Sequence, residues 1–153
     1  MGRIYHKDIY DFDNPVKSYW EETSHPHQEN YPKLSGDQKC DIVVIGGGFT
    51  GISTAYHLAK KYESDVHLLE AGHVGWASSG RNAGFVCLPS TKLSNKQLFK
   101  KYGVEETKNF FKAQVEGMNL IESIMQENSI ECEKTGRGNY DVAHHPDSAN
   151  ELK

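Results

Sequence analysis

Residues 41–51 read Asp41-Ile42-Val43-Val44-Ile45-Gly46-Gly47-Gly48-Phe49-Thr50-Gly51, and this stretch decides the fold of the chain. Four β-branched residues lead straight into a Gly-x-Gly-x-x-Gly pattern, and a helical pattern follows over about 49–62. A second apolar run, at 66–69, ends on Glu70. Strand, glycine turn, helix, strand and acid in this order form the fingerprint of a dinucleotide-binding βαβ unit. We therefore predict two parallel strands joined by a helix.

Each glycine of the pattern has its own expected role. Gly46 permits the sharp turn out of the strand, and Gly48 leaves no Cβ where a pyrophosphate approaches the backbone. Gly51 lets the helix pack close to the strand. The first helical turn, with Phe49 and Thr50, presents free N–H groups and the positive end of the helix dipole, which suits a phosphate. Because the apolar run at 42–45 is continuous, we expect a central strand buried on both faces.

Glu70 lies 19 residues past Gly51, close to the spacing of a ribose-binding acid. A carboxylate there accepts hydrogen bonds from ribose hydroxyls, each contributing roughly 1.5–3 kcal/mol. The same charge repels a 2′-phosphate, so NADP is disfavoured and FAD and NAD remain open. A βα turn without any ligand is the alternative, but it leaves the agreement of strand, glycines and acid unexplained.

The segment after the second strand distinguishes between these cofactors. Residues 75–86 are rich in small and hydrogen-bonding side chains and lack the period of a helix or a strand. A simple NAD-binding unit would pass into another helix at this point. A glycine-rich segment with one cation, Arg81, instead suits close wrapping around a large anionic ligand. A surface loop without a function is the other interpretation of the same composition.

These motifs resemble the FAD-dependent amine oxidoreductases of the D-amino-acid oxidase/glycine oxidase superfamily, and most of all the gamma-glutamylputrescine oxidoreductase type. Residues 42–51, 68–71 and 77–84 carry the resemblance, and Ser18-Tyr19-Trp20 is similar to the same subgroup. The resemblance implies an FAD-dependent oxidoreductase that oxidises a small-molecule amine by hydride transfer to the flavin. It assigns no catalytic residue.

The resemblance also implies a set of cofactor-binding residues. Gly46, Gly48 and Gly51 would hold the pyrophosphate of FAD. Glu70 would bind the adenosine ribose, and Arg81 would support the cofactor electrostatically. The full set is Gly46, Gly48, Phe49, Thr50, Gly51, Glu70, Ser78, Ser79, Gly80, Arg81, Asn82 and Gly84.

Composition excludes several other classes of protein. A formal charge of −4 argues against a general nucleic-acid binder, which needs a basic surface. No apolar run approaches the ~20 residues that span a bilayer, and the first residues lack the apolar core of a secretory signal. The three cysteines, Cys40, Cys87 and Cys132, have no metal-ligand spacing, and His25 and His27 have no second cluster. We expect reduced thiols, no metal site and a cytoplasmic location.

The expected fold class is α/β: a Rossmann-like FAD-binding βαβ unit with an incomplete parallel sheet, followed by the start of an α+β substrate domain. We divide the chain into an irregular N-terminal arm (1–40), the FAD-binding unit (41–90) and a helical segment that opens the substrate domain (91–153). The aromatic motif at 18–20 is expected to dock on another surface. A capping box at 94–97 opens a short helix that stops at Gly103, a longer helix follows, and strands are expected at 130–135 and 139–143.

Two parallel strands leave an unpaired sheet edge and too little apolar cover. We therefore expect the N-terminal portion of an oxidase, either a truncated product or one half of a split enzyme with a separate C-terminal chain. An inactive remnant, a dinucleotide-binding subunit and a small NAD-binding protein are the alternatives. Whether the chain alone is an enzyme stays open.

Overall fold

A computed structural model describes residues 6–24, 31–88, 90–136, 138, 140, 142–146 and 149. The chain divides into two compact units, Met1–Gly84 and Phe85–Lys153, which are described separately below. Among the described residues, no helix is both long and apolar enough to cross a bilayer.

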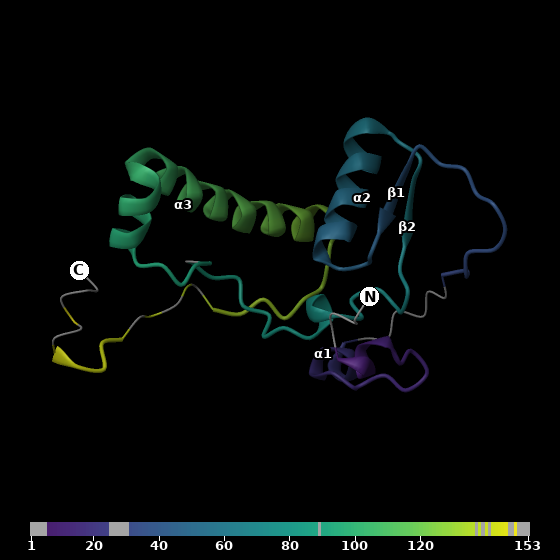
Figure 1. Cartoon of the computed structure of the whole chain (residues 1–153), viewed down its shortest axis with the longest axis horizontal. Coiled ribbons are helices and arrows are strands. Elements are labelled where there is room, and N and C mark those ends of the chain that lie inside the picture. Colours follow the sequence, from purple (N-terminus) through teal and green to yellow (C-terminus); the bar gives the residue numbers. More distant parts are fainter. Residues whose placement is uncertain are drawn as a thin grey trace. The chain divides into compact units, whose positions relative to one another are not determined.

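The first unit contains the expected βαβ arrangement (Figure 1). Strand β1 (Ile42–Ile45) pairs in parallel with β2 (Val66–Leu69), in a register that sets Ile42 opposite Val66 and Ile45 opposite Leu69. Helix α2 (Phe49–Tyr62) joins the strands and packs against both. Glu63, in the left-handed region at φ 51°, ends the helix and turns the chain back toward β2. The prediction of a mixed α/β unit with two parallel strands is confirmed.

The burial of β1 differs from the expectation. Val43 is 51% exposed and Ile45 is 83% exposed, whereas Ile42 and Val44 on the other face are half-buried. The prediction of a strand buried on both faces is therefore wrong for this structure. The physical reason is that α2 packs on the two-stranded sheet from one side, and the side chains of Val43 and Ile45 lie outside that contact.

The N-terminal arm is more ordered than the aromatic composition indicated. A 3-10 helix, η1 (Lys7–Tyr10), is followed by the short helix α1 (Tyr19–Thr23). Ser18 and Glu21 form a capping box at the start of α1, because each side chain accepts a hydrogen bond from the other residue's backbone N–H. The prediction of an irregular arm is therefore wrong at 7–10 and 19–23, and it is confirmed at 31–40, where the structure has neither helix nor strand. The Ser-x-x-Glu spacing was the signal that could have shown the helix.

The hydrophobic centre of the first unit lies beneath this arm, not under the sheet. Trp76, 6% exposed, is the only buried hydrophobic side chain among the described residues of that unit. Its ring contacts Phe12 of the arm at a centroid distance of 5.2 Å, and its indole N–H donates to the carbonyl of Ile9 at 2.8 Å. Ile9 and Phe12 thus dock on a surface of the same chain, and the motif expected to dock, at 18–20, contacts that chain through Ser18 and Trp20.

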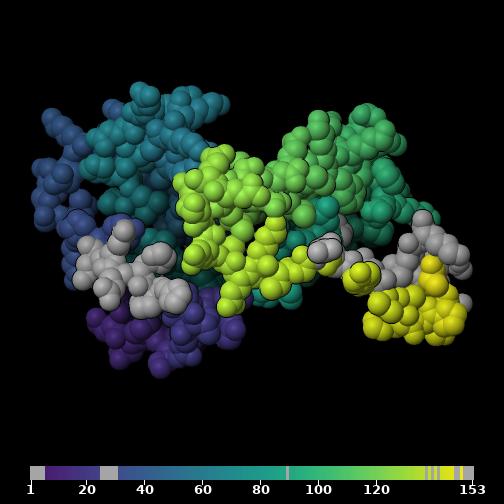
Figure 2. All heavy atoms as spheres, turned by 180° about the vertical axis from the view of Figure 1, so that it is seen from behind, coloured from purple at the N-terminus to yellow at the C-terminus, as the bar shows by residue number. Residues whose placement is uncertain are grey.

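The second unit is built on α3 (Asn95–Glu127). Ser94 and Gln97 form the expected capping box, and Gly103 interrupts the helix with φ 79° and ψ 175°, where the sequence predicted a stop. Leu98 and Thr107 are its buried residues, and much of the green side-chain surface of α3 is open to solvent in Figure 2.

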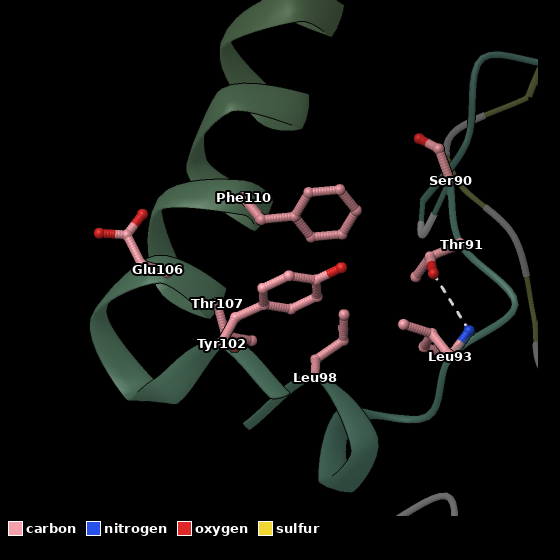
Figure 3. Close-up of a pocket in the computed structure, with 8 residues that line it drawn as sticks. All are labelled: Ser90, Thr91, Leu93, Leu98, Tyr102, Glu106, Thr107 and Phe110. Atoms are coloured by element: carbon pink, nitrogen blue, oxygen red, sulfur yellow. Dashed lines mark hydrogen bonds between the residues drawn. The ribbon is translucent and has the colours of Figure 1, made fainter. Parts of the chain in front are cut away.

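A cavity of about 310 Å³ lies between residues 90–93 and the first half of α3. Leu93, Leu98, Tyr102 and Phe110 are among its lining residues. The Tyr102 and Phe110 rings lie side by side and face the loop, whereas Glu106 points away from it (Figure 3). The position of Leu98 at the base of this cavity makes it a main packing residue of the unit.

The strand expected at 130–135 is absent. Residues 130–136 form no helix or strand, and Ile130 is 50% exposed. An alternating apolar pattern stabilises a strand only where a partner supplies hydrogen bonds and a surface to bury, and the described residues of this unit supply neither. Part of the second expected strand, at 139 and 141, and the paired histidines at 25 and 27 lie outside the described residues.

Candidate cofactor-binding site

The glycine turn brings backbone groups into unusually close approach. Gly46 adopts φ 104°, which favours glycine, and its N–H donates to the carbonyl of Leu69 at 2.7 Å. A Cβ built on Gly51 would lie 1.8 Å from the carbonyl oxygen of Gly46, so no side chain fits there. A Cβ on Gly48 would lie 2.9 Å from the hydroxyl of Ser79. The start of α2 therefore lies directly against the glycine turn and against Ser79.

Ser79 connects the two sequence motifs directly. Its hydroxyl accepts a hydrogen bond of 2.9 Å from the backbone N–H of Phe49, the first residue of α2. A second link runs from the N–H of Gly75 to the carbonyl of Gly47, at 2.9 Å. The start of α2, with the positive end of its dipole, thus lies beside a serine hydroxyl. This arrangement suits a phosphate of a dinucleotide.

Glu70 faces the glycine turn. Its Oε2 accepts from the N–H of Gly47 at 2.5 Å, and its Oε1 accepts from the N–H of Gly72 at 2.9 Å. Burial alone would raise the pKa of Glu70, but hydrogen bonds from the backbone N–H groups of Gly72, Gly47 and Ala71 hold that pKa below its ordinary value of 4.5. The side chain is therefore ionised at neutral pH. An ionised carboxylate offers about four acceptor positions, which leaves capacity for a ribose hydroxyl.

The loop that follows is shaped by its own asparagine. Residues Ser78–Gly80 form one turn of 3-10 helix, η2. The amide of Asn82 donates to the carbonyls of Ser78 and Ser79, at 3.2 and 2.9 Å, and its Oδ1 accepts from the N–H of Gly84 at 2.8 Å. A Cβ on Gly80 would lie 2.3 Å from the carbonyl oxygen of Gly75, so the turn also needs glycine. Asn82 and Gly80 hold the loop in the shape that presents Ser79.

Arg81 is directed toward the arm. Its Nε donates to the carbonyl of Trp76 at 2.9 Å, its Nη1 donates to the carbonyl of Val16, and its Nη2 lies 3.5 Å from Glu21 Oε1. The guanidinium carbon also lies 5.6 Å from the centroid of the Trp76 ring. Three residues from two segments, through four contacts, therefore fix a side chain that the sequence assigned to electrostatic support of the cofactor.

The structure thus brings together only part of the predicted set. Gly46, Gly48, Phe49, Gly51, Glu70 and Ser79 meet around the start of α2. Ser78, Gly80, Asn82 and Gly84 shape the neighbouring loop, Arg81 faces the arm, and Thr50 is exposed in the first turn of α2. Sequence reasoning missed Glu21, His73 and Trp76. Among the described residues no group of three or more histidines, cysteines or acids could hold a metal ion.

Comparison with known proteins gives this site a context. The family model described as "FAD dependent oxidoreductase" (DAO) matches residues 41–153. The chain is 33% identical over 103 residues to gamma-glutamylputrescine oxidoreductase of Escherichia coli (strain K12), covering 67% of this chain and 24% of that protein. It is 40% identical over 65 residues to the oxidoreductase OrdL of Rhizobium meliloti (strain 1021), covering 42% of this chain and 15% of that protein.

Sarcosine oxidase subunit beta of Rhizobium meliloti (strain 1021) is 32% identical over 107 residues, which cover 65% of this chain and 25% of that subunit. The chain therefore spans about a quarter or less of the length of these curated relatives. No solved structure matches the chain.

Proposed function

Since the chain belongs to the DAO family of FAD-dependent oxidoreductases, we propose that it is the FAD-binding portion of an enzyme that oxidises amines. The observation that carries this proposal is the meeting of both motifs at one place: Ser79 and Glu70 each accept a hydrogen bond from the glycine turn or the start of α2. A βα turn without a ligand would not need a carboxylate and a hydroxyl at these positions.

The residues present fit the FAD of this family. The backbone at Gly48 and the start of α2 would hold the pyrophosphate, with beside it the Ser79 hydroxyl, which lies close to where a side chain at residue 48 would be. Glu70 would bind the adenosine ribose through its remaining acceptor capacity. The loop of Ser78–Gly84 would continue from the diphosphate toward the flavin. Every one of these contacts would bind or orient the cofactor.

When bound, FAD would supply the redox chemistry, namely acceptance of a hydride from the carbon that carries the amine nitrogen. The protein's contribution is binding, orientation and a fixed electrostatic environment. We assign no residue of this chain to proton transfer, because an amine that reacts in its neutral form does not require a base. An amine substrate is favoured by the names of the relatives, which include a gamma-glutamylputrescine oxidoreductase and a sarcosine oxidase subunit.

We propose that the substrate pocket lies in the part of the relatives to which this chain does not align, about three quarters of their length. We propose that activity needs this remainder, in the same polypeptide or as a separate C-terminal chain. We also propose a cytoplasmic location, which the three free thiols Cys40, Cys87 and Cys132 favour, because a reducing compartment preserves thiols.

The Glu70→Ala variant tests the proposed site. Loss of the charge-assisted contacts to the ribose should raise the dissociation constant for FAD about tenfold or more, measured by quenching of flavin fluorescence during titration. The matched control is Glu105→Ala, which removes an exposed carboxylate from α3 and should leave the dissociation constant unchanged. Equal FAD affinity of wild type and Glu70→Ala would refute the ribose role, and preference for NAD over FAD would refute the proposed cofactor.

A further inference from the structure

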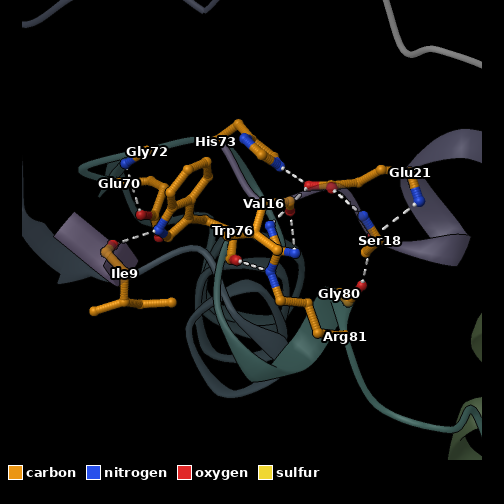
Figure 4. A network of polar contacts seen from close by, with 10 residues as sticks. All are labelled: Ile9, Val16, Ser18, Glu21, Glu70, Gly72, His73, Trp76, Gly80 and Arg81. Atoms are coloured by element: carbon orange, nitrogen blue, oxygen red, sulfur yellow. Dashed lines mark hydrogen bonds and ion pairs between the residues drawn. The ribbon is translucent and has the colours of Figure 1, made fainter. Parts of the chain in front are cut away.

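The described residues 6–24 of the N-terminal arm contact the loop formed by residues 72–84. They do so at both ends of the loop and in its middle. The loop follows Glu70 directly and contains Ser79, so it carries the groups assigned to the cofactor. The contacts extend over the whole arm and pair Ile9 with Trp76, Phe12 with Trp76, Val16 with Arg81, Ser18 with Gly80, Trp20 with Asn82 and Glu21 with His73. Most of these side chains are drawn in Figure 4.

Trp20 holds the far end of the loop. Its indole N–H donates to the carbonyl of Asn82 at 2.6 Å. The side-chain amide of Asn82 in turn fixes the turn that presents Ser79. A Cβ on Gly84 would lie 3.0 Å from the ring of Trp20, so the ring lies directly against the loop backbone. The next polar contact along the arm, from the Ser18 hydroxyl to the carbonyl of Gly80 at 3.3 Å, lies on the same turn. The arm thus restrains the backbone on both sides of Asn82.

Glu21 joins the start of the loop, at His73, to its middle, at Arg81. Its Oε1 lies 2.6 Å from Nε2 of His73 and 3.5 Å from Nη2 of Arg81 (Figure 4). His73 follows Glu70 by three residues, and Arg81 follows Ser79 by two. One carboxylate on the arm therefore joins the segment beside the proposed ribose contact to the segment beside the proposed phosphate contact. Its own position is fixed by the capping box with Ser18.

Arg81 is the clearest sign of this arrangement. A guanidinium in a cofactor loop that served the phosphates would have its donors free for them. Here the Nε and Nη1 groups donate to the carbonyls of Trp76 and Val16, and Nη2 faces Glu21. The side chain is 21% exposed, so these partners also enclose it. Its positive charge is used to attach the loop to the arm.

We propose that the arm is a strap that holds the loop 72–84 in its FAD-binding shape before the cofactor arrives, with Trp20 and Glu21 as positioning residues. The inference rests on the proposed function, because it assigns the strapped loop to FAD. A loop that is already ordered loses less conformational entropy when a ligand binds, so its affinity for that ligand is higher. The strap raises FAD affinity although neither Trp20 nor Glu21 needs to touch FAD.

The test compares Glu21→Gln with Glu22→Gln in the full chain. Both variants remove one carboxylate from α1, but among the described residues Glu22 forms an ion pair with the exposed Lys17 alone, whereas Glu21 joins His73 and Arg81. Glu21→Gln should raise the FAD dissociation constant about tenfold, equivalent to about 1.4 kcal/mol, and Glu22→Gln should not change it. Hydrogen exchange in the FAD-free protein should be faster over 72–84 in Glu21→Gln alone, and saturating FAD should restore the protection.

Trp20→Phe is the second variant, since it keeps an aromatic ring but removes the donor to Asn82 and the part of the indole that lies against Gly84. It should produce the same pair of effects and decides the matter if Glu21→Gln does not fold. Faster exchange in the loop with unchanged FAD affinity would overturn the strap and leave the proposed function intact. A wild-type chain that binds no FAD would overturn the proposed function, and the strap with it.

Discussion

Replacing Gly51 with alanine should destabilise the first unit, although alanine is ordinarily the better helix former. The added Cβ would lie 1.8 Å from the carbonyl oxygen of Gly46 and 3.0 Å from its carbonyl carbon. The obstacle is backbone, so the start of α2 must move by about 1 Å to make even a tight contact. Overpacking of this kind costs up to about 3 kcal/mol, and the helix propensity of alanine offsets up to about 1 kcal/mol. We expect a net loss of about 2 kcal/mol.

Urea unfolding followed by tryptophan fluorescence measures this loss, because both tryptophans, Trp20 and Trp76, lie in the first unit. With a slope of about 1–2 kcal/mol per molar urea, the midpoint should fall by about 1 M or more. The matched control is Gly117→Ala, where a Cβ within α3 meets nothing within 4 Å. That variant should stabilise α3 by about 0.5–1 kcal/mol, measured by far-UV circular dichroism.

An unchanged fluorescence midpoint in Gly51→Ala would refute the reasoning, because it would mean that the close approach of α2 to the glycine turn is not tight. A similar loss in Gly117→Ala would show that alanine is unfavourable for reasons other than this contact. The structure therefore requires that Gly51→Ala lowers the free energy of unfolding and that Gly117→Ala raises it.

Three further predictions concern charge and packing. Glu70→Gln should lower the free energy of unfolding of the first unit by about 1–3 kcal/mol, measured by tryptophan fluorescence. The amide group of the glutamine would face a backbone N–H that now donates to a carboxylate oxygen. Glu70 and Glu21 have folded-state pKa values below 4.5, in each case because hydrogen bonds outweigh the effect of burial, which raises the pKa. Their contribution to stability is therefore complete above pH 4.5 and is lost as pH falls through the lowered values; acid unfolding of Glu21→Gln should show a shallower pH dependence. Leu98→Ala should cost the second unit about 2–4 kcal/mol by far-UV circular dichroism, because Leu98 is 4% exposed and borders an existing cavity.

The sequence predicted the features that local chemistry determines. The glycine spacing, the apolar runs and the acid at Glu70 were sufficient for the βαβ unit, because each has a short-range cause in backbone geometry or hydrogen bonding. The kink at Gly103 and the capping box at Ser94 follow from equally local rules. These elements could be placed to within a few residues from sequence alone.

Features that depend on long-range partners were not predictable in the same way. The sequence around Arg81 does not show that this side chain contacts Val16 and Glu21, which lie more than fifty positions earlier. The apolar run of β1 indicated burial on both faces, but burial depends on what packs against the strand, and Ile45 remains 83% exposed. The alternating pattern at 130–135 predicted a strand, but a strand also needs a pairing partner, which a local pattern does not show.

Hydrogen exchange of the full chain with and without FAD tests the central claim most directly. If one site is built from both motifs, added FAD should slow exchange together in residues 46–51 and 78–84, with half-maximal protection at the same FAD concentration. Slower exchange in only one of these segments, or in neither at saturating FAD, would contradict a common site at the start of α2.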